Sequence, residues 1–202
     1  MKRTISIYLI MMCIAGLVLG FVACSGGNQI ETEETLSDDL NSLMFRLDGV
    51  VYTFPVHFSE LEANGWIAYD TDPRSGSAYR FATDTLEPGN SVGWELIIGD
   101  QNIVAGFANR SEAVLPVSES YIVDFSVLSG QFDAQLVLPG NVTLGSTGED
   151  VIAAFGYPSA VDIFEDHSRA LLFYSSDYFI LQISINTEND RVVMMSLHYR
   201  VS

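Results

Sequence analysis

The side chains best suited to bind a cation lie in two acidic segments of the chain. One segment holds three acids and a histidine within six residues: Asp162, Glu165, Asp166 and His167. The other is a looser group around residues 73–76: Asp70, Asp72 and Asp84. Calcium takes about six to eight oxygen ligands, usually from a loop that turns at a glycine. Because neither segment has that spacing, the sequence predicts solvated acidic loops and no metal site.

Most catalytic motifs are absent from the sequence. It has no G-x-x-x-x-G-K phosphate loop, no G-x-G-x-x-G motif and no H-E-x-x-H motif, and its one G-x-S-x-G match, at residues 89–93, does not by itself specify a nucleophile. Three histidines are scattered along the chain: His57, His167 and His198. A serine hydrolase would need one of them close to a serine and an acid in space, and no pattern selects such a set. We therefore expect no catalysis and no cofactor.

Aromatic side chains are the other candidates for a binding surface. Five of them stand out: Trp66, Tyr69, Tyr79, Trp94 and Tyr157. Tyrosine and tryptophan are favoured at protein interfaces, but they also fill cores. We expect core packing for most of the five, Trp66 and Tyr157 especially. Strand residues that face away from the core are better candidates for contacting a partner.

The residues around Cys24 predict a chemical modification of this cysteine. Lys2 and Arg3 precede an almost wholly apolar run, residues 5–21, as in a secretory signal peptide. The run is also close to the length of a minimal membrane span, so a retained anchor helix is one alternative. A plain signal peptide with an incidental cysteine is another. Phe21-Val22-Ala23-Cys24 resembles the lipobox of bacterial lipoproteins, with Phe21 in place of the usual leucine. The resemblance implies that residues 1–23 are removed and that the Cys24 thiol carries a diacylglyceryl group.

The composition after Cys24 fits a protein held on a membrane. Residues 24–42 are rich in glycine and acids and poor in apolar residues, which predicts a flexible tether. Loss of residues 1–23 would leave seven basic residues against 26 acidic ones, a net charge of −19. Such a chain repels nucleic acid. The charge favours solubility, and a basic partner or divalent cations are the alternative explanation.

Two segments of the chain resemble each other. Residues 45–66 and 136–157 align at an offset of 91 with five identities in 22 positions. Each segment predicts a short helix that ends at a glycine, Gly65 or Gly156. Ser59 with Glu62, and Thr147 with Asp150, have the spacing of a capping box. Two unrelated strand–turn–helix units that share glycine positions are the alternative.

Antiparallel strands are predicted after each helix, from alternating apolar and polar residues. They cover 79–81, 92–98 and 103–107 in the first half, and 170–174, 179–185 and 191–199 in the second. A further hairpin from Tyr121 to Leu138, turning near Ser129-Gly130, would link the halves. The expected fold is α+β with two related units, residues 43–120 and 121–202, each a short helix packed on an antiparallel meander.

This pattern resembles the β-lactamase-inhibitor-protein-like fold. The stretch from Leu138 to Tyr199 carries the resemblance, marked by Gly140, Gly145, Val151, Phe155, Gly156, Tyr157 and Pro158. The first half, with LDGVVYTFPVHFSELEANGW, is similar to uncharacterised lipoproteins of Gram-positive bacteria. The resemblance implies protein binding through an exposed sheet face, and it implies no particular partner.

Together these observations predict a lipid-anchored, extracytoplasmic interaction protein of the bacterial cell envelope. Its contacts would be the membrane, through lipidated Cys24, and a protein partner, with no nucleic acid. Binding of a small molecule or a cell-wall glycan is the main alternative. An envelope hydrolase is the least favoured one.

Overall fold

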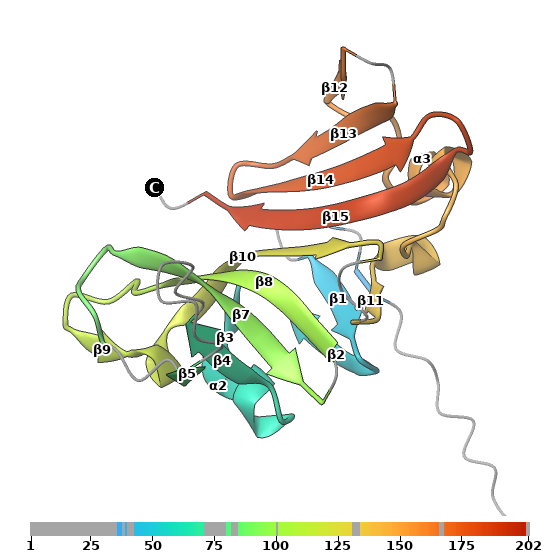
Figure 1. Cartoon of the computed structure of the whole chain (residues 1–202). Coiled ribbons are helices and arrows are strands. Elements are labelled where there is room, and N and C mark those ends of the chain that lie inside the picture. Colours follow the sequence, from blue (N-terminus) through green and yellow to red (C-terminus); the bar gives the residue numbers. More distant parts are fainter. Residues whose placement is uncertain are drawn as a thin grey trace, which may run out of the picture. The chain divides into compact units, whose positions relative to one another are not determined.

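One long antiparallel sheet organises the folded part of the chain, seen in the computed structural model in Figure 1. The structure describes residues 36–37, 39, 43–70, 80–81, 85–99, 101–130, 134–165 and 168–200, with only the backbone at 70, 80 and 81. Residues 35–202 belong to one compact unit. The protein is mostly antiparallel β-sheet with two short helices, α2 (Phe58–Ala63) and α3 (Gly148–Phe155).

The main sheet has the strand order β12-β13-β14-β15-β10-β8-β7-β4-β5, with β3 paired to β10 off this path. Four strands follow α3: β12 (Ala160–Ile163), β13 (Arg169–Ser175), β14 (Phe179–Asn186) and β15 (Arg191–Tyr199). The others are β3 (Val56–His57), β4 (Ile67–Asp70), β5 (Arg80–Phe81), β7 (Ser91–Ile98), β8 (Gln101–Ala108) and β10 (Tyr121–Leu128). The two halves of the sheet meet where β15 pairs with β10.

Smaller elements complete the fold. A three-stranded sheet has the order β11-β1-β2, from β1 (Met44–Leu47), β2 (Val50–Thr53) and β11 (Leu136–Val137). A two-stranded sheet joins β6 (Thr85–Leu86) to β9 (Leu115–Pro116). Two 3-10 turns are η1 (Val117–Glu119) and η2 (Pro139–Asn141).

The strands predicted after each helix are confirmed as β5, β7, β8, β13, β14 and β15. The predicted hairpin from Tyr121 to Leu138 is wrong. β10 pairs with β15, β8 and β3, whereas β11 pairs with β1. The turn at Gly130, with a φ of 78°, does end β10. The chain then leaves the main sheet, because Leu136 fills the core beside Leu47 and Phe45.

Of the two predicted helix caps, one is confirmed and the other is wrong. Thr147 caps α3 with the reciprocal bonds of a capping box: its hydroxyl accepts from the Asp150 N–H, and Asp150 accepts from the Thr147 N–H at 2.8 Å. That backbone hydrogen bond, followed by the Thr147 hydroxyl, lowers the pKa of Asp150. Ser59 does not cap α2, which begins one residue earlier, at Phe58. The Phe58 N–H donates to the Ser120 carbonyl, so a tertiary contact sets this helix start.

The core lies against one face of the main sheet. Phe125 of β10 contacts Phe45 and Phe54, with ring centroids 4.9 and 5.7 Å apart. Phe58 of α2 lies 5.2 Å from Phe107 of β8, and Phe155 of α3 lies 5.5 Å from Tyr174 of β13. Both helices and the β1–β2 hairpin therefore pack on the same face, and the opposite face is left for other contacts.

Candidate functional site

The uncovered side of the main sheet is the candidate functional site, and we call it the open face. Residues directly opposite each other on paired strands point to the same side of a sheet. The strand registers place one row across six strands on this side: Gln182, Ser196, Ser126, Val104, Glu95 and Tyr69. The neighbouring row on the core side is Leu181, Leu197, Phe125, Ala105 and Trp94, all buried. This row of the open face is thus mostly polar, whereas the row on the core face is apolar. Elsewhere the open face also carries apolar residues, among them Phe173, Ile180 and Met194.

A histidine–carboxylate pair stands at the centre of the open face. His198 of β15 lies directly opposite Asp124 of β10. The His198 Nδ1 donates to Asp124 Oδ2 at 2.8 Å, and both side chains are partly exposed. This hydrogen bond raises the pKa of His198, and the charge of Asp124 adds to the effect, while burial opposes them. The imidazole is therefore held in one orientation and is more readily protonated than a free histidine.

Small residues flank this pair on the side of β8 and β7, whereas Ile180 of β14 lies opposite His198 on the other side. Gly106 of β8 faces Asp124, and a Cβ on Gly106 would lie only 2.8 Å from the Asp124 Cβ. Gly93 of β7 faces Gly106 in turn and has an open space where a Cβ would stand. The absence of side chains at these two positions gives the carboxylate room beside β8.

Two serines lie one position along the same strands. The hydroxyls of Ser126 and Ser196 share a hydrogen bond of 2.7 Å across β10 and β15. Their hydroxyls thus bond each other, and neither serine is paired with His198 in the described residues. A nucleophilic serine needs its base within hydrogen-bond reach, so this geometry supports binding better than hydrolysis. Ser196 is itself buried, whereas Asp124 and His198 are partly exposed.

Arg110 lies beside the start of β10 and the end of β15, and sequence reasoning missed it. Its guanidinium carbon lies 4.5 Å from the centre of the Tyr199 ring and 5.5 Å from that of Tyr121. It also donates to the Tyr199 hydroxyl at 3.0 Å. Stacking on two rings fixes one of the few cations of this chain. Tyr121 in turn meets His57 edge to face, 5.0 Å away.

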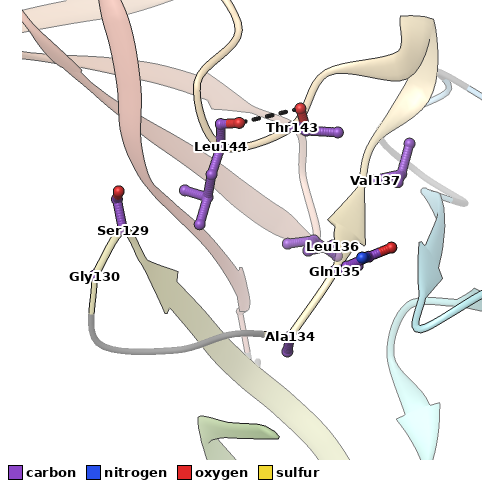
Figure 2. A pocket seen from close by; sticks show the side chains of 8 residues that line it. All are labelled: Ser129, Gly130, Ala134, Gln135, Leu136, Val137, Thr143 and Leu144. Atoms are coloured by element: carbon purple, nitrogen blue, oxygen red, sulfur yellow. Dashed lines mark hydrogen bonds between the residues drawn. The ribbon is translucent and has the colours of Figure 1, made fainter.

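A separate pocket of roughly 430 Å³ opens beside the end of β10. Figure 2 shows Ser129 and Gly130 on one side and Leu136 on the other, with Leu144 pointing between them. The remaining lining residues are Ala134, Gln135, Val137 and Thr143. The lining holds no charged or aromatic side chain, so it suits a small apolar group better than a sugar, which stacks on aromatic rings.

The aromatic residues singled out from the sequence separate into two environments. Trp66 and Trp94 are buried in the core, as predicted, and Tyr69 is half-buried on β4. The prediction for Tyr157 is wrong, because its side chain is 87% exposed. Trp66 leads directly into β4 inside the sheet, whereas Tyr157 precedes Pro158 and the edge strand β12. Tyr79 lies outside the described residues.

The structure describes the two acidic segments only in part. Asp162 and Glu165 are exposed around β12, while the Asp70 side chain and residues 72, 84, 166 and 167 fall outside the description. Among the described residues, no group of three or more His, Cys, Asp or Glu side chains is placed to hold a metal ion.

The proposed anchor also falls outside the described residues. This applies to Cys24, to the signal peptide at 1–23 and to all of the tether at 24–42 except residues 36, 37 and 39. Within the described part of the chain, no helix is long and apolar enough to cross a membrane.

Searches of protein-family models, of curated proteins and of solved structures found no match to this chain. The resemblances to lipoproteins and to the β-lactamase-inhibitor-protein-like fold therefore stay predictions from the sequence.

Proposed function

We propose that this chain is a lipid-anchored, extracytoplasmic interaction protein of the bacterial cell envelope, which binds a partner protein through the open face. The observation that carries the proposal is the sheet itself. Both described helices and the β1–β2 hairpin pack on one side, and the other side presents the Asp124–His198 pair beside the glycines of β7 and β8. The net charge of −17 argues against nucleic acid as the partner.

The anchor in this proposal is Cys24. Each buried methylene of an acyl chain contributes ~0.8 kcal/mol, and two chains anchor stably where one holds only marginally. Growth with a labelled fatty acid should label the wild-type chain and not Cys24→Ser. Cys13→Ser is the matched control, because Cys13 lies in the predicted signal peptide. Label that persists in Cys24→Ser would remove the anchor from the proposal.

Two related units are the second part of the proposal. Each short helix is followed by strands that occupy half of the main sheet: β4, β5, β7, β8 and β10 after α2, and β12 to β15 after α3. The two sets meet at the centre, where β10 pairs with β15. On this division β10 belongs to the first set, so the boundary between the units would lie after β10 and not at 120/121, as the sequence suggested. The opposite exposures of Trp66 and Tyr157 are the main departure from symmetry.

Binding through the open face is tested with two exposed valines. Val104 lies on the open face and is 44% exposed, and Val114 lies in a loop and is 49% exposed. Val104→Arg places a large cation on the open face beside Asp124, whereas Val114→Arg changes charge and size equally elsewhere. Both full-length variants would be purified from membranes after chemical crosslinking of intact cells. We expect Val104→Arg to lose the crosslinked partner that wild type and Val114→Arg retain. Equal capture by both variants would exclude the open face.

A small apolar ligand is the second candidate function, and the pocket beside β10 favours it. Its test is thermal unfolding in the presence of small apolar compounds, because a ligand that binds only the folded state raises the melting temperature. Leu144→Lys should abolish any such shift, because Leu144 points into the pocket.

A further inference from the structure

β12 is an edge of the main sheet that nothing in the described residues covers. It is the first strand in the sheet order and pairs only with β13. All four of its residues are exposed, including Val161 at 53% and Ile163 at 54%. β13, β14 and β15 each bury several residues. An apolar strand this exposed is unusual for a monomeric protein.

The backbone of β12 offers hydrogen bonds on its free side. In an antiparallel pair, successive residues alternately direct their N–H and C=O groups toward the partner strand and away from it. The Phe164 N–H donates to the Arg169 carbonyl. Two residues earlier on β12, Asp162 pairs with Leu171, which is two residues later on β13. Phe164 and Asp162 therefore point their backbone groups at β13. Val161 and Ile163 direct theirs outward, where an added strand would meet them.

β12 lacks several of the usual protections of an edge strand. Natural edges are protected by short length, charged side chains, proline, a bulge or a covering segment, and β12 has the first two of these, with four residues and one acid. β12 contains no proline or lysine, and its pairing with β13 runs without a bulge. Its one charged residue is Asp162, which lies on the opposite side of the strand from Val161 and Ile163. Phe164 and Tyr157, beyond the two ends of the strand, are also exposed.

We propose that β12 takes up an extended segment of a partner protein as an additional strand, with alternating apolar and basic side chains. Apolar side chains of the segment would pack beside Val161 and Ile163, and basic ones would face Asp162 and Glu165. Arg169 of β13 offsets part of the negative charge of Asp162 and Glu165. Over longer range, the net charge of −17 of the whole chain also attracts a basic segment. A second copy of this chain fits less well, because it brings the same negative charge.

This inference rests on the proposed function only in that both need a protein partner. It concerns a different surface, since β12 is an outer strand and Val104 lies near the middle of the sheet. If no peptide binds at β12, the result of the Val104→Arg crosslinking test is unaffected. If Val104→Arg keeps its crosslinked partner, the peptide-binding result at β12 is unaffected.

The test uses the full chain in detergent and three synthetic peptides of equal length. One peptide alternates valine and lysine, one alternates valine and glutamate, and one repeats the valine–lysine sequence with N-methylated valines. Binding is measured by fluorescence anisotropy of the labelled peptide. The protein variant Val161→Lys/Ile163→Lys places two charged side chains on β12 and should disfavour the addition of a strand. Val114→Lys is the control at a similarly exposed valine. Because all three positions are exposed, the variants should keep the wild-type melting temperature.

The valine–lysine peptide is expected to bind wild type and Val114→Lys equally. Binding to the double variant, and of the N-methylated peptide to wild type, should be at least about tenfold weaker, equivalent to about 1.4 kcal/mol. Equal binding of the valine–lysine and valine–glutamate peptides would overturn the charge argument. Equal binding to the double variant would overturn the site. A wild-type dimer that becomes a monomer in the double variant would show a second copy to be the occupant, and would also overturn the proposal.

Discussion

Among the glycines that the structure describes, Gly140 has the least room for a Cβ atom. It has a φ of 69°, and a Cβ placed on it would lie 2.6 Å from the Ala154 Cβ. η2 and α3 are thus in close contact at this point. Gly49, its counterpart in the sequence alignment, has a φ of 83° and nothing within 4 Å of the same position. The two glycines share a backbone conformation and differ in available space, so they form a matched pair.

Substitution by alanine should separate the cost of the left-handed backbone conformation from the cost of the steric clash. A left-handed conformation costs a residue with a Cβ about 1–2 kcal/mol, and this applies to both Gly140→Ala and Gly49→Ala. Overpacking adds about 1–3 kcal/mol, and only Gly140→Ala meets it. For a domain of this size, 1 kcal/mol corresponds to about 2–4 °C in melting temperature. Gly140→Ala should therefore melt about 2–12 °C below Gly49→Ala.

Urea and thermal unfolding of the purified variants measure this difference. A double-mutant cycle adds a second check, because Ala154→Gly removes the atom with which the new methyl group collides. Ala154→Gly alone should cost about 1 kcal/mol of helix stability. Combined with Gly140→Ala, it should cost less than the sum of the two. An equal loss for Gly140→Ala and Gly49→Ala, or an additive cycle, would refute the reasoning from this contact.

Three further predictions concern the cap, the core and the open face. Thr147→Ala should lower the free energy of unfolding by about 1 kcal/mol in urea titration, through loss of the α3 cap; no change would mean that the cap is not formed. Phe125→Ala should cost about 3–5 kcal/mol, whereas Val104→Ala, on the open face, should stay within about 0.5 kcal/mol; similar losses would contradict the assignment of faces. Because the folded-state pKa of His198 is raised, the stability it contributes is full below its ordinary value of 6.5 and is lost as the pH rises through the raised pKa. Asp124→Asn should remove this pH dependence from thermal unfolding curves, and an unchanged profile would assign it to another group.

The elements that were predicted correctly have strong local signals. β14 alternates apolar and polar residues over most of its length, and Thr147 with Asp150 has the spacing of a capping box. β12 was missed because it is short and its residues are all exposed, so burial imposes no alternation on it. The partners of β10 were mispredicted for another reason. Its pairing with β15 joins residues about 70 positions apart, and no local pattern carries that information.

The residues of the candidate site could not be paired from the sequence for the same reason. His198 stood out as one of three histidines, but Asp124 is 74 residues away and only the strand register brings the two together. The aligned aromatics Trp66 and Tyr157 gave the same expectation and have opposite exposures. What separates them is position in the sheet, since β4 lies between two strands and β12 at the edge. Sequence comparison within one chain holds no information about that difference.

The central claim is that a partner protein contacts the open face in the cell. The most direct measurement places a photoreactive amino acid at Val104 or at Val114 of the full chain and irradiates intact bacteria. The account predicts a discrete crosslinked protein from Val104 and none from Val114. Crosslinking to the same protein from both positions, or from Val114 alone, would contradict it.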